Sequence, residues 1–220
     1  MKRSLFILIV AFGSVVYGQT DSIEKAVLRN KILAKEIEES EFSKIWIRWN
    51  QAISEVKYPD LPLDQNGQVH YIFINEFERF DKDTLFTRTL EWLSINYGII
   101  PSAIYSSLKE GKIILRNSLE PANGKTCIYT TIISIKEKKI RMEIINILYQ
   151  TFYEGHYSSD TWIPEKTINT RINEVYPIVL KKPVEWNSNL NLLRRTNELF
   201  DKEFKNLCDY IISFENSDKF

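Results

Sequence analysis

Three consecutive segments rich in β-branched residues limit what this chain can fold into more than any other feature. They span residues 111–119, 126–135 and 139–149. The turn signal Asn123-Gly124 separates the first two, and the charged loop Lys136-Glu137-Lys138 joins the second to the third. Loops this short join neighbouring antiparallel strands, because a parallel crossover needs a dozen or more residues. We therefore expect an antiparallel meander.

Helical patterns and a further strand surround this meander. Residues 69–77 are typical of a strand, and apolar residues on both of its faces predict cover on both sides for part of its length. Residues 81–97 have apolar side chains at helical spacing behind Asp81, a residue type that caps helix N-termini. Residues 21–56 and 189–213 show the same spacing.

This order of elements predicts an α+β fold. We expect an antiparallel sheet of about four or more strands with helices packed on one face, plus a long N-terminal helix and a C-terminal helix. Residues 19–57 form the N-terminal helical extension, 58–150 the α+β domain and 189–220 the C-terminal helix and tail. Gly155, Pro164, Pro177 and Pro183 interrupt residues 151–188, which we expect to be an irregular segment.

The first eighteen residues have the layout of an export signal. Lys2 and Arg3 precede the apolar run SLFILIVAFGSVV, and small residues precede a cleavage site between Gly18 and Gln19. The run is shorter than the roughly 20 residues that a membrane-spanning helix needs. No Cys follows it to carry a lipid anchor. We expect a signal peptide over residues 1–18, a periplasmic or secreted protein, and no later membrane span; a retained N-terminal anchor is the alternative.

The balance of acidic and basic residues limits the classes of partner that we expect for this chain. The 29 basic residues balance 29 acidic ones. Removing Lys2 and Arg3 with the signal peptide leaves the chain slightly acidic. A nucleic-acid binder would show a basic face, so we expect no nucleic-acid partner. An envelope protein or a glycan remains as a partner.

The sequence contains two cysteines, Cys127 and Cys208. In an oxidising compartment a lone pair of cysteines tends to be joined, so a Cys127–Cys208 disulfide is one expectation. Two buried, unpaired thiols are the alternative. Neither cysteine has a catalytic signature around it.

The residues that carry metal and acid–base chemistry are sparse. The two histidines, His70 and His156, have no companion at zinc-binding spacing, so we expect no metal and no cofactor. Acids gather at Glu76, Glu78, Asp81 and Asp83. They suit either a glycosidase pair or the capping of the helix that follows.

The segment YEGHYSSDTW is the one place where aromatic, imidazole, hydroxyl and carboxylate groups crowd together in an expected loop. Loops on a rigid scaffold often carry function. Its candidate contacts for a sugar or a peptide are Tyr153, His156, Tyr157 and Trp162. Alternatively, the segment covers one edge of the sheet.

Parts of the sequence resemble an exported Bacteroidota domain of unknown function with a TATA-binding-protein-like (TBP-like) fold. The resemblance is carried by the stretches LPLDQNGQVHYIF, KDTLFTRTLEWLSINY, EGKIILRNSLE and CIYTTIISIKEKKIRMEIINI. It covers roughly residues 61–150 and implies that fold and export. It implies no activity, cofactor or catalytic residue.

Three functional hypotheses follow. The leading one is an exported, non-catalytic binding or interaction module of unknown ligand. The second is an envelope or glycan hydrolase that uses Glu76, Glu78 or His156. The third is a structural or assembly partner that offers the N-terminal helix, with Trp46 and Trp49, to another chain; core packing is the competing interpretation of these tryptophans.

Overall fold

The computed structural model describes residues 38–55, 59–97, 103–158, 161–176, 178 and 185–213. The predicted signal peptide, the cleavage site at Gly18 and Gln19, and the first part of the predicted N-terminal helix lie outside these residues.

The meander lies in an antiparallel sheet with the strand order β1-β5-β4-β3-β2. The bounds of these strands are β1 (Tyr71–Glu76), β2 (Ala103–Ser107), β3 (Lys112–Ala122), β4 (Lys125–Lys136) and β5 (Lys139–Tyr153). The turns after β3 and β4 contain Gly124 and Lys138, with φ of 68° and 58°. The predicted order of the three central strands is confirmed. β2 is an additional strand that the sequence analysis did not predict.

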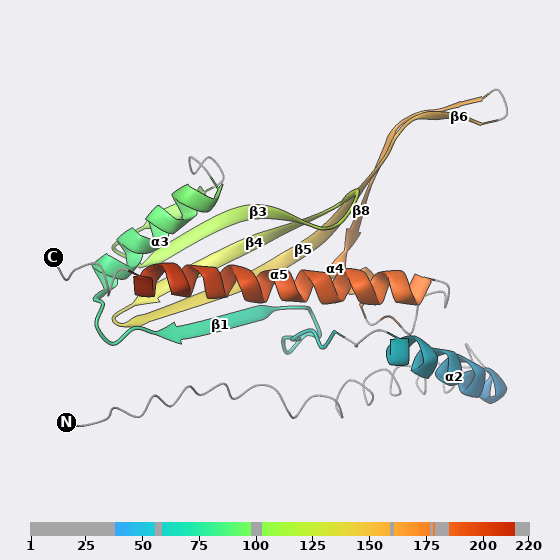
Figure 1. Ribbon diagram of the computed structural model, residues 1–220, viewed down its shortest axis with the longest axis horizontal. Coiled ribbons are helices and arrows are strands. Elements are labelled where there is room, and N and C mark those ends of the chain that lie inside the picture. Colours follow the sequence, from blue (N-terminus) through green and yellow to red (C-terminus); the bar gives the residue numbers. More distant parts are fainter. Residues whose placement is uncertain are drawn as a thin grey trace.

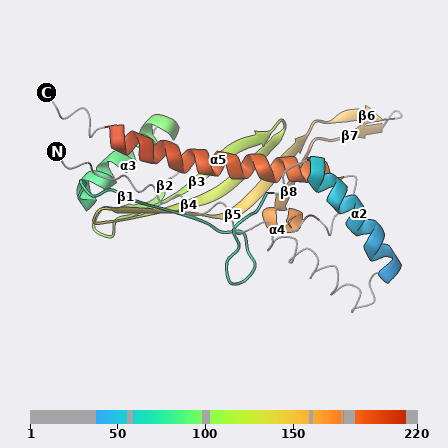
Figure 2. The ribbon, with the colours of Figure 1, turned by 60° about the horizontal axis from the view of Figure 1, so that its bottom comes forward.

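Helices cover one face of this sheet. α3 (Lys82–Tyr97) and α5 (Trp186–Ser213) lie on the same side, and α5 runs across almost the whole sheet (Figure 1). Figure 2 shows both helices above the strands when the molecule is turned. α3 buries Leu85, Phe86 and Trp92 against the sheet, as its spacing predicts. The predicted α+β architecture is confirmed.

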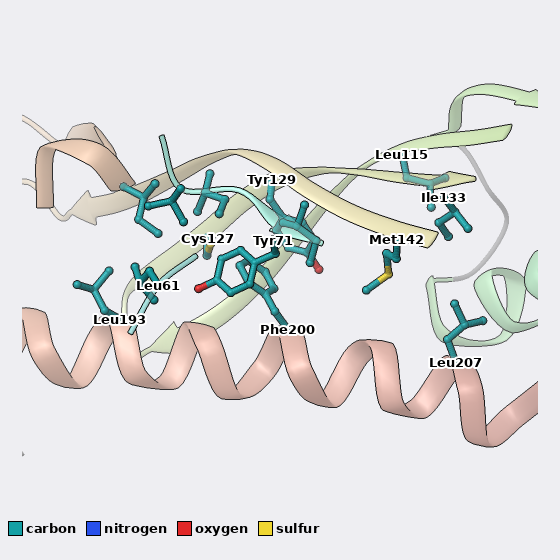
Figure 3. Close-up of a cluster of buried hydrophobic side chains, with 14 of the residues drawn as sticks. Leu61, Tyr71, Leu115, Cys127, Tyr129, Ile133, Met142, Leu193, Phe200 and Leu207 are labelled. Carbon is teal, nitrogen blue, oxygen red and sulfur yellow. The ribbon is translucent and has the colours of Figure 1, made fainter. Parts of the chain in front are cut away.

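The core fills the space between the sheet and α5. The ring of Phe200 lies between Tyr71 of β1 and Tyr129 of β4, with centroid distances of 5.0 and 4.9 Å and edge-on geometry (Figure 3). Further along α5, Leu207 extends toward the end of the sheet that carries Met142 (Figure 3). All five side chains are almost completely buried. The apolar stripe of α5 therefore holds the helix against several strands at once.

The opposite face of β1 is open to solvent. Ile72 and Ile74 are exposed. The expected cover on both sides of β1 is therefore wrong. Arg141, which pairs with Ile74 across the strands, is also exposed.

A β-bulge in β5 changes which side chains enter the core. Two residues, Asn146 and Ile147, face the single residue Tyr129 of β4. Asn146 has φ of 54°, a left-handed conformation that Asn tolerates better than most residues. The buried positions are even-numbered up to Ile144 and odd-numbered from Ile147 on. The bulge thus keeps the second half of β5 facing α5.

Residues 151–188 are more regular than expected. β5 continues to Tyr153, and the elements after it are β6 (His156–Ser158), β7 (Thr161–Ile163), β8 (Lys166–Arg171) and α4 (Ile172–Val175). β8 pairs with the second half of β5. Gly155 and Pro164 interrupt the strands only at the joints before β6 and after β7. Within the described residues, the expectation of an irregular segment is therefore wrong, because these breakers lie between the strands of one long hairpin.

Candidate functional site

The predicted contact residues lie on a projecting hairpin. β6 and β7 pair with each other as a separate two-stranded sheet. They extend away from the body of the molecule beyond β8 (Figure 1). We call β6 and β7 the arm. Figure 2 shows the same projection from a second direction. The alternative prediction, a segment that covers a sheet edge, does not describe the arm.

Tyr157 and Trp162 are the two candidate contacts that the arm brings together. They are directly opposite each other on β6 and β7, with ring centroids 5.0 Å apart and planes tilted by 57°. They are nevertheless 75% and 53% exposed. A Cβ atom at Gly155 would lie 2.5 Å from the Trp162 ring, so the missing side chain there leaves room for the indole. The arm therefore displays a packed aromatic pair to solvent.

His156 and Tyr153 do not join this pair. His156 is opposite Ile163, and one strand position from Tyr157, so its side chain points to the other face of the arm. Its Nδ1 lies 3.4 Å from the carbonyl oxygen of Glu154. Tyr153 is exposed at the end of β5, opposite Lys166.

The acids of residues 76–83 lie at the other end of the sheet. Glu76 forms an ion pair with Lys139, with Oε1 and Nζ 2.9 Å apart. Asp81 accepts a hydrogen bond of 2.7 Å from the backbone N–H of Thr84, at the start of α3. This bond holds the pKa of the Asp81 carboxyl below its ordinary value. Asp81 therefore caps the helix, as the capping interpretation predicts.

The acids near residues 76–83 lie far from His156, the other residue of the hydrolase hypothesis. Glu76 pairs with Lys139, where β5 begins, whereas His156 follows Tyr153, where β5 ends. Fourteen residues of extended strand span roughly 45 Å. Glu78 and Asp83 are exposed near the turn that leads into α3. An acid of this group and His156 therefore cannot act on one glycosidic bond.

The two cysteines are free thiols. Cys127 is opposite Tyr149 in the sheet, and the Tyr149 hydroxyl lies 2.9 Å from Oγ1 of Thr196 on α5. Cys208 lies on α5, whereas Cys127 lies on β4. Both thiols are unpaired: Cys127 is buried and Cys208 is partly buried. Burial raises the pKa of each thiol to about 12.

The tryptophans of the N-terminal helix face the body of the molecule. α2 (Glu39–Glu55) places Trp49 edge-on against Trp186, with ring centroids 5.3 Å apart. Trp46 is partly buried and stacks on Phe42 at 6.1 Å. Trp49, which is buried in the core, is therefore not available to a second chain, and the assembly hypothesis loses this anchor.

A second cluster of functional groups lies between α3, α5 and the sheet. Glu203 on α5 is only 9% exposed. Its Oε1 accepts a hydrogen bond of 2.5 Å from the Tyr97 hydroxyl of α3, and its Oε2 accepts one of 2.6 Å from the Tyr129 hydroxyl of β4. One carboxyl group thus connects two helices and the sheet.

Burial shifts the pKa of each member of this cluster. It raises the pKa of Glu203, and the two phenol hydrogen bonds offset only part of that shift. It raises the pKa of Tyr97 and of Tyr129 as well, and the Glu203 charge adds to both shifts. The phenols therefore remain protonated hydrogen-bond donors, while the carboxyl group holds its proton to a higher pH than an exposed glutamate does.

The sequence contains a local signal for this cluster. Glu203 lies three residues after Phe200 and four before Leu207, both of which are buried. An acid at helical spacing within an apolar stripe is a candidate buried carboxylate, because a charged residue is rarely buried without a partner. The partner residues Tyr97 and Tyr129 carry no such signal, since nothing local relates them to α5.

The described residues contain neither a metal-binding cluster nor a membrane-spanning helix. No group of three or more His, Cys, Asp or Glu side chains is placed to hold a metal ion among the described residues. No helix in the described part of the chain is long and apolar enough to cross a membrane.

Comparison with known proteins identifies the fold. No family model and no curated protein matches the sequence. A TBP-like protein from Parabacteroides distasonis ATCC 8503 is similar in structure, with a TM-score of 0.50 and 18% identity over 69% of this chain and 96% of that chain. A DUF4468 family protein from Bacteroides ovatus ATCC 8483 has a TM-score of 0.48 and 13% identity, over 69% and 90% of the two chains. The first likeness confirms the TBP-like fold that the resemblance implies.

Proposed function

We propose that this chain is an exported, non-catalytic interaction module that contacts a partner protein through the arm. The observation that carries the proposal is the aromatic pair Tyr157 and Trp162, which is exposed on a hairpin that projects from the body. Exposed apolar patches on a folded domain mark interaction sites more often than isolated apolar residues do. Trp and Tyr are also the residue types enriched among the strongest contacts of protein interfaces.

The geometry of the arm favours a protein partner over a glycan. β6 and β7 pair only with each other among the described strands, so each has an outer edge to which a partner strand can be added. The rings of Tyr157 and Trp162 are tilted by 57° instead of forming a flat platform for a sugar. Small ligands also bind in concave sites, and the pocket lined by Trp92, Tyr97 and Glu203 lies between α3 and α5, away from the arm.

Site-specific photo-crosslinking in the envelope of the native host tests this proposal. A photoreactive phenylalanine replaces Tyr157 in one variant and Ile95 in the matched control. Ile95 is 68% exposed on α3 and lies on the body of the molecule, not on the arm. We expect a discrete protein adduct at position 157 that is lost when Trp162→Ser is added.

Two results would overturn the proposal. The first is an adduct at position 157 that is no more abundant than the one at position 95. The second is binding of envelope polysaccharide to the immobilised protein in the absence of any protein adduct. If Trp162→Ser abolished that binding, the partner would be a glycan. Circular dichroism of each variant establishes that the fold is retained.

A further inference from the structure

The Glu203 carboxylate has hydrogen-bonding capacity that the described residues leave unused. An ionised carboxylate offers about four acceptor positions. The hydroxyls of Tyr97 and Tyr129 occupy one on each oxygen. No Lys, Arg or His of the described residues forms an ion pair with it. A buried acid without a cation is costly, because its charge loses most of its hydration and no opposite charge neutralises it.

This carboxylate lines a pocket that a ligand can enter. The pocket has a volume of about 250 Å³ and lies between α3, α5 and the strands β3 and β4. Trp92, Tyr97 and Tyr129 supply aromatic walls, and the rings of Trp92 and Tyr97 meet edge-on at 5.7 Å. The exposed side chains of Lys202 and Asn206 also line the pocket, so it opens to solvent. The volume suits a ligand of about the size of an amino acid.

We propose that this pocket binds the ammonium group of a small amine, with Glu203 as the residue that receives it. An ammonium group supplies three N–H donors and the missing positive charge. Aromatic walls add to this preference, because a cation is attracted to the faces of Trp and Tyr rings. Lys202 at the opening repels a second positive charge, so a ligand whose far end is neutral or anionic fits better than a diamine.

Calorimetric titration of the full-length protein with 5-aminopentanoate tests this inference. Pentanoate is the matched probe, since it has the same chain length and carboxylate but no ammonium group. We expect saturable binding of 5-aminopentanoate and none of pentanoate. Glu203→Gln should weaken binding at least about tenfold, the loss expected for a hydrogen bond between charged groups.

Two further variants separate binding from folding. Asp201→Asn removes the same charge from an exposed position of α5 that does not line the pocket, and it should leave the affinity unchanged. Asn96→Trp fills the pocket from an exposed position of α3 without touching the carboxyl group, and it should abolish binding. Equal binding of pentanoate and 5-aminopentanoate, no binding of either, or full affinity in Asn96→Trp would overturn the inference. None of these outcomes bears on the arm, which lies elsewhere on the molecule.

Discussion

At Glu203 two opposing effects act on one carboxyl group. Burial disfavours its charged form, whereas the hydroxyls of Tyr97 and Tyr129 stabilise that form by hydrogen bonding. Burial is the larger effect, and the pKa is raised. Its other neighbours are Cys127, whose thiol pKa is also raised by the Glu203 charge, and Lys202 at the pocket opening. The carboxyl group therefore titrates in a setting where its phenol and thiol neighbours stay neutral.

The sign of the resulting pH dependence follows from linkage. In the unfolded chain Glu203 has its ordinary pKa of about 4.5, and in the folded chain it holds its proton to a higher pH. The folded state then binds more protons, so the free energy of unfolding falls as pH rises from about 4.5 through the folded-state pKa. The slope approaches about 1.4 kcal/mol per pH unit at most.

We expect Glu203→Gln to remove this part of the pH dependence. The difference in free energy of unfolding, wild type minus variant, should be largest at low pH and decrease as pH rises. Other titrating groups cancel in this difference. Urea melts at a series of pH values measure it. A difference that stays constant or grows with pH would show that Glu203 is not buried with a raised pKa.

At the scale of elements, separate residues of α3 determine where the helix begins and which of its faces packs on the sheet. Asp81 caps its first turn, and Leu85, Phe86 and Trp92 enter the core. The cap determines where the helix begins, and the buried face determines how it lies on the sheet. Phe86 of this helix therefore belongs to the core, whereas Trp92 and Tyr97 also line the pocket beside Glu203.

Phe86→Ala should destabilise the protein by about 3 kcal/mol or more, because it leaves a cavity beside the sheet. Ile95→Ala is the control in the same helix. Because the Ile95 side chain is exposed, this substitution should change the free energy of unfolding by no more than about 0.5 kcal/mol. Guanidinium melts of the two variants give the comparison. Equal, small effects of both substitutions would place Phe86 outside the core.

At the scale of the whole molecule, the arm and the body are separate structural units. The ladder between β5 and β8 ends at the pair Tyr153 and Lys166, and the arm lies beyond it. The core lies between the sheet and α5, and none of the described residues of β6 and β7 belongs to it. A segment without a structural role that still displays Tyr157 and Trp162 is a candidate contact surface.

Replacing residues 154–165 by Asn-Gly should therefore leave the stability unchanged within about 0.5 kcal/mol. The new turn closes the β5–β8 hairpin directly after its last pair. Denaturant melts and near-ultraviolet circular dichroism check this expectation. A loss comparable to that of Phe86→Ala would mean that the arm packs on the body, and the proposed interaction surface would then be structural.

Local patterns predicted several parts of this molecule correctly. The alternation and short turns of residues 111–149 gave the central strands, and the spacing around Phe86 gave the face of α3. The hairpin of residues 151–171 was missed, because Gly155 and Pro164 are typical of loops as well as of the joints between short strands. Asn146 was a usable signal for the bulge, since a polar residue occupies a position where the alternation requires an apolar one.

Contacts between distant elements decided the candidate sites. The hydrogen bonds that Tyr97 and Tyr129 donate to Glu203 join residues that are 106 and 74 positions apart in the sequence. The separation of Glu76 from His156 depends in the same way on the pairing of β1 with β5 and on the length of β5. Periodicity is a property of neighbouring residues, so the sequence by itself determined the types and order of the central elements. Only the packing of α3 and α5 on the sheet decided which polar groups meet in a pocket and which face solvent.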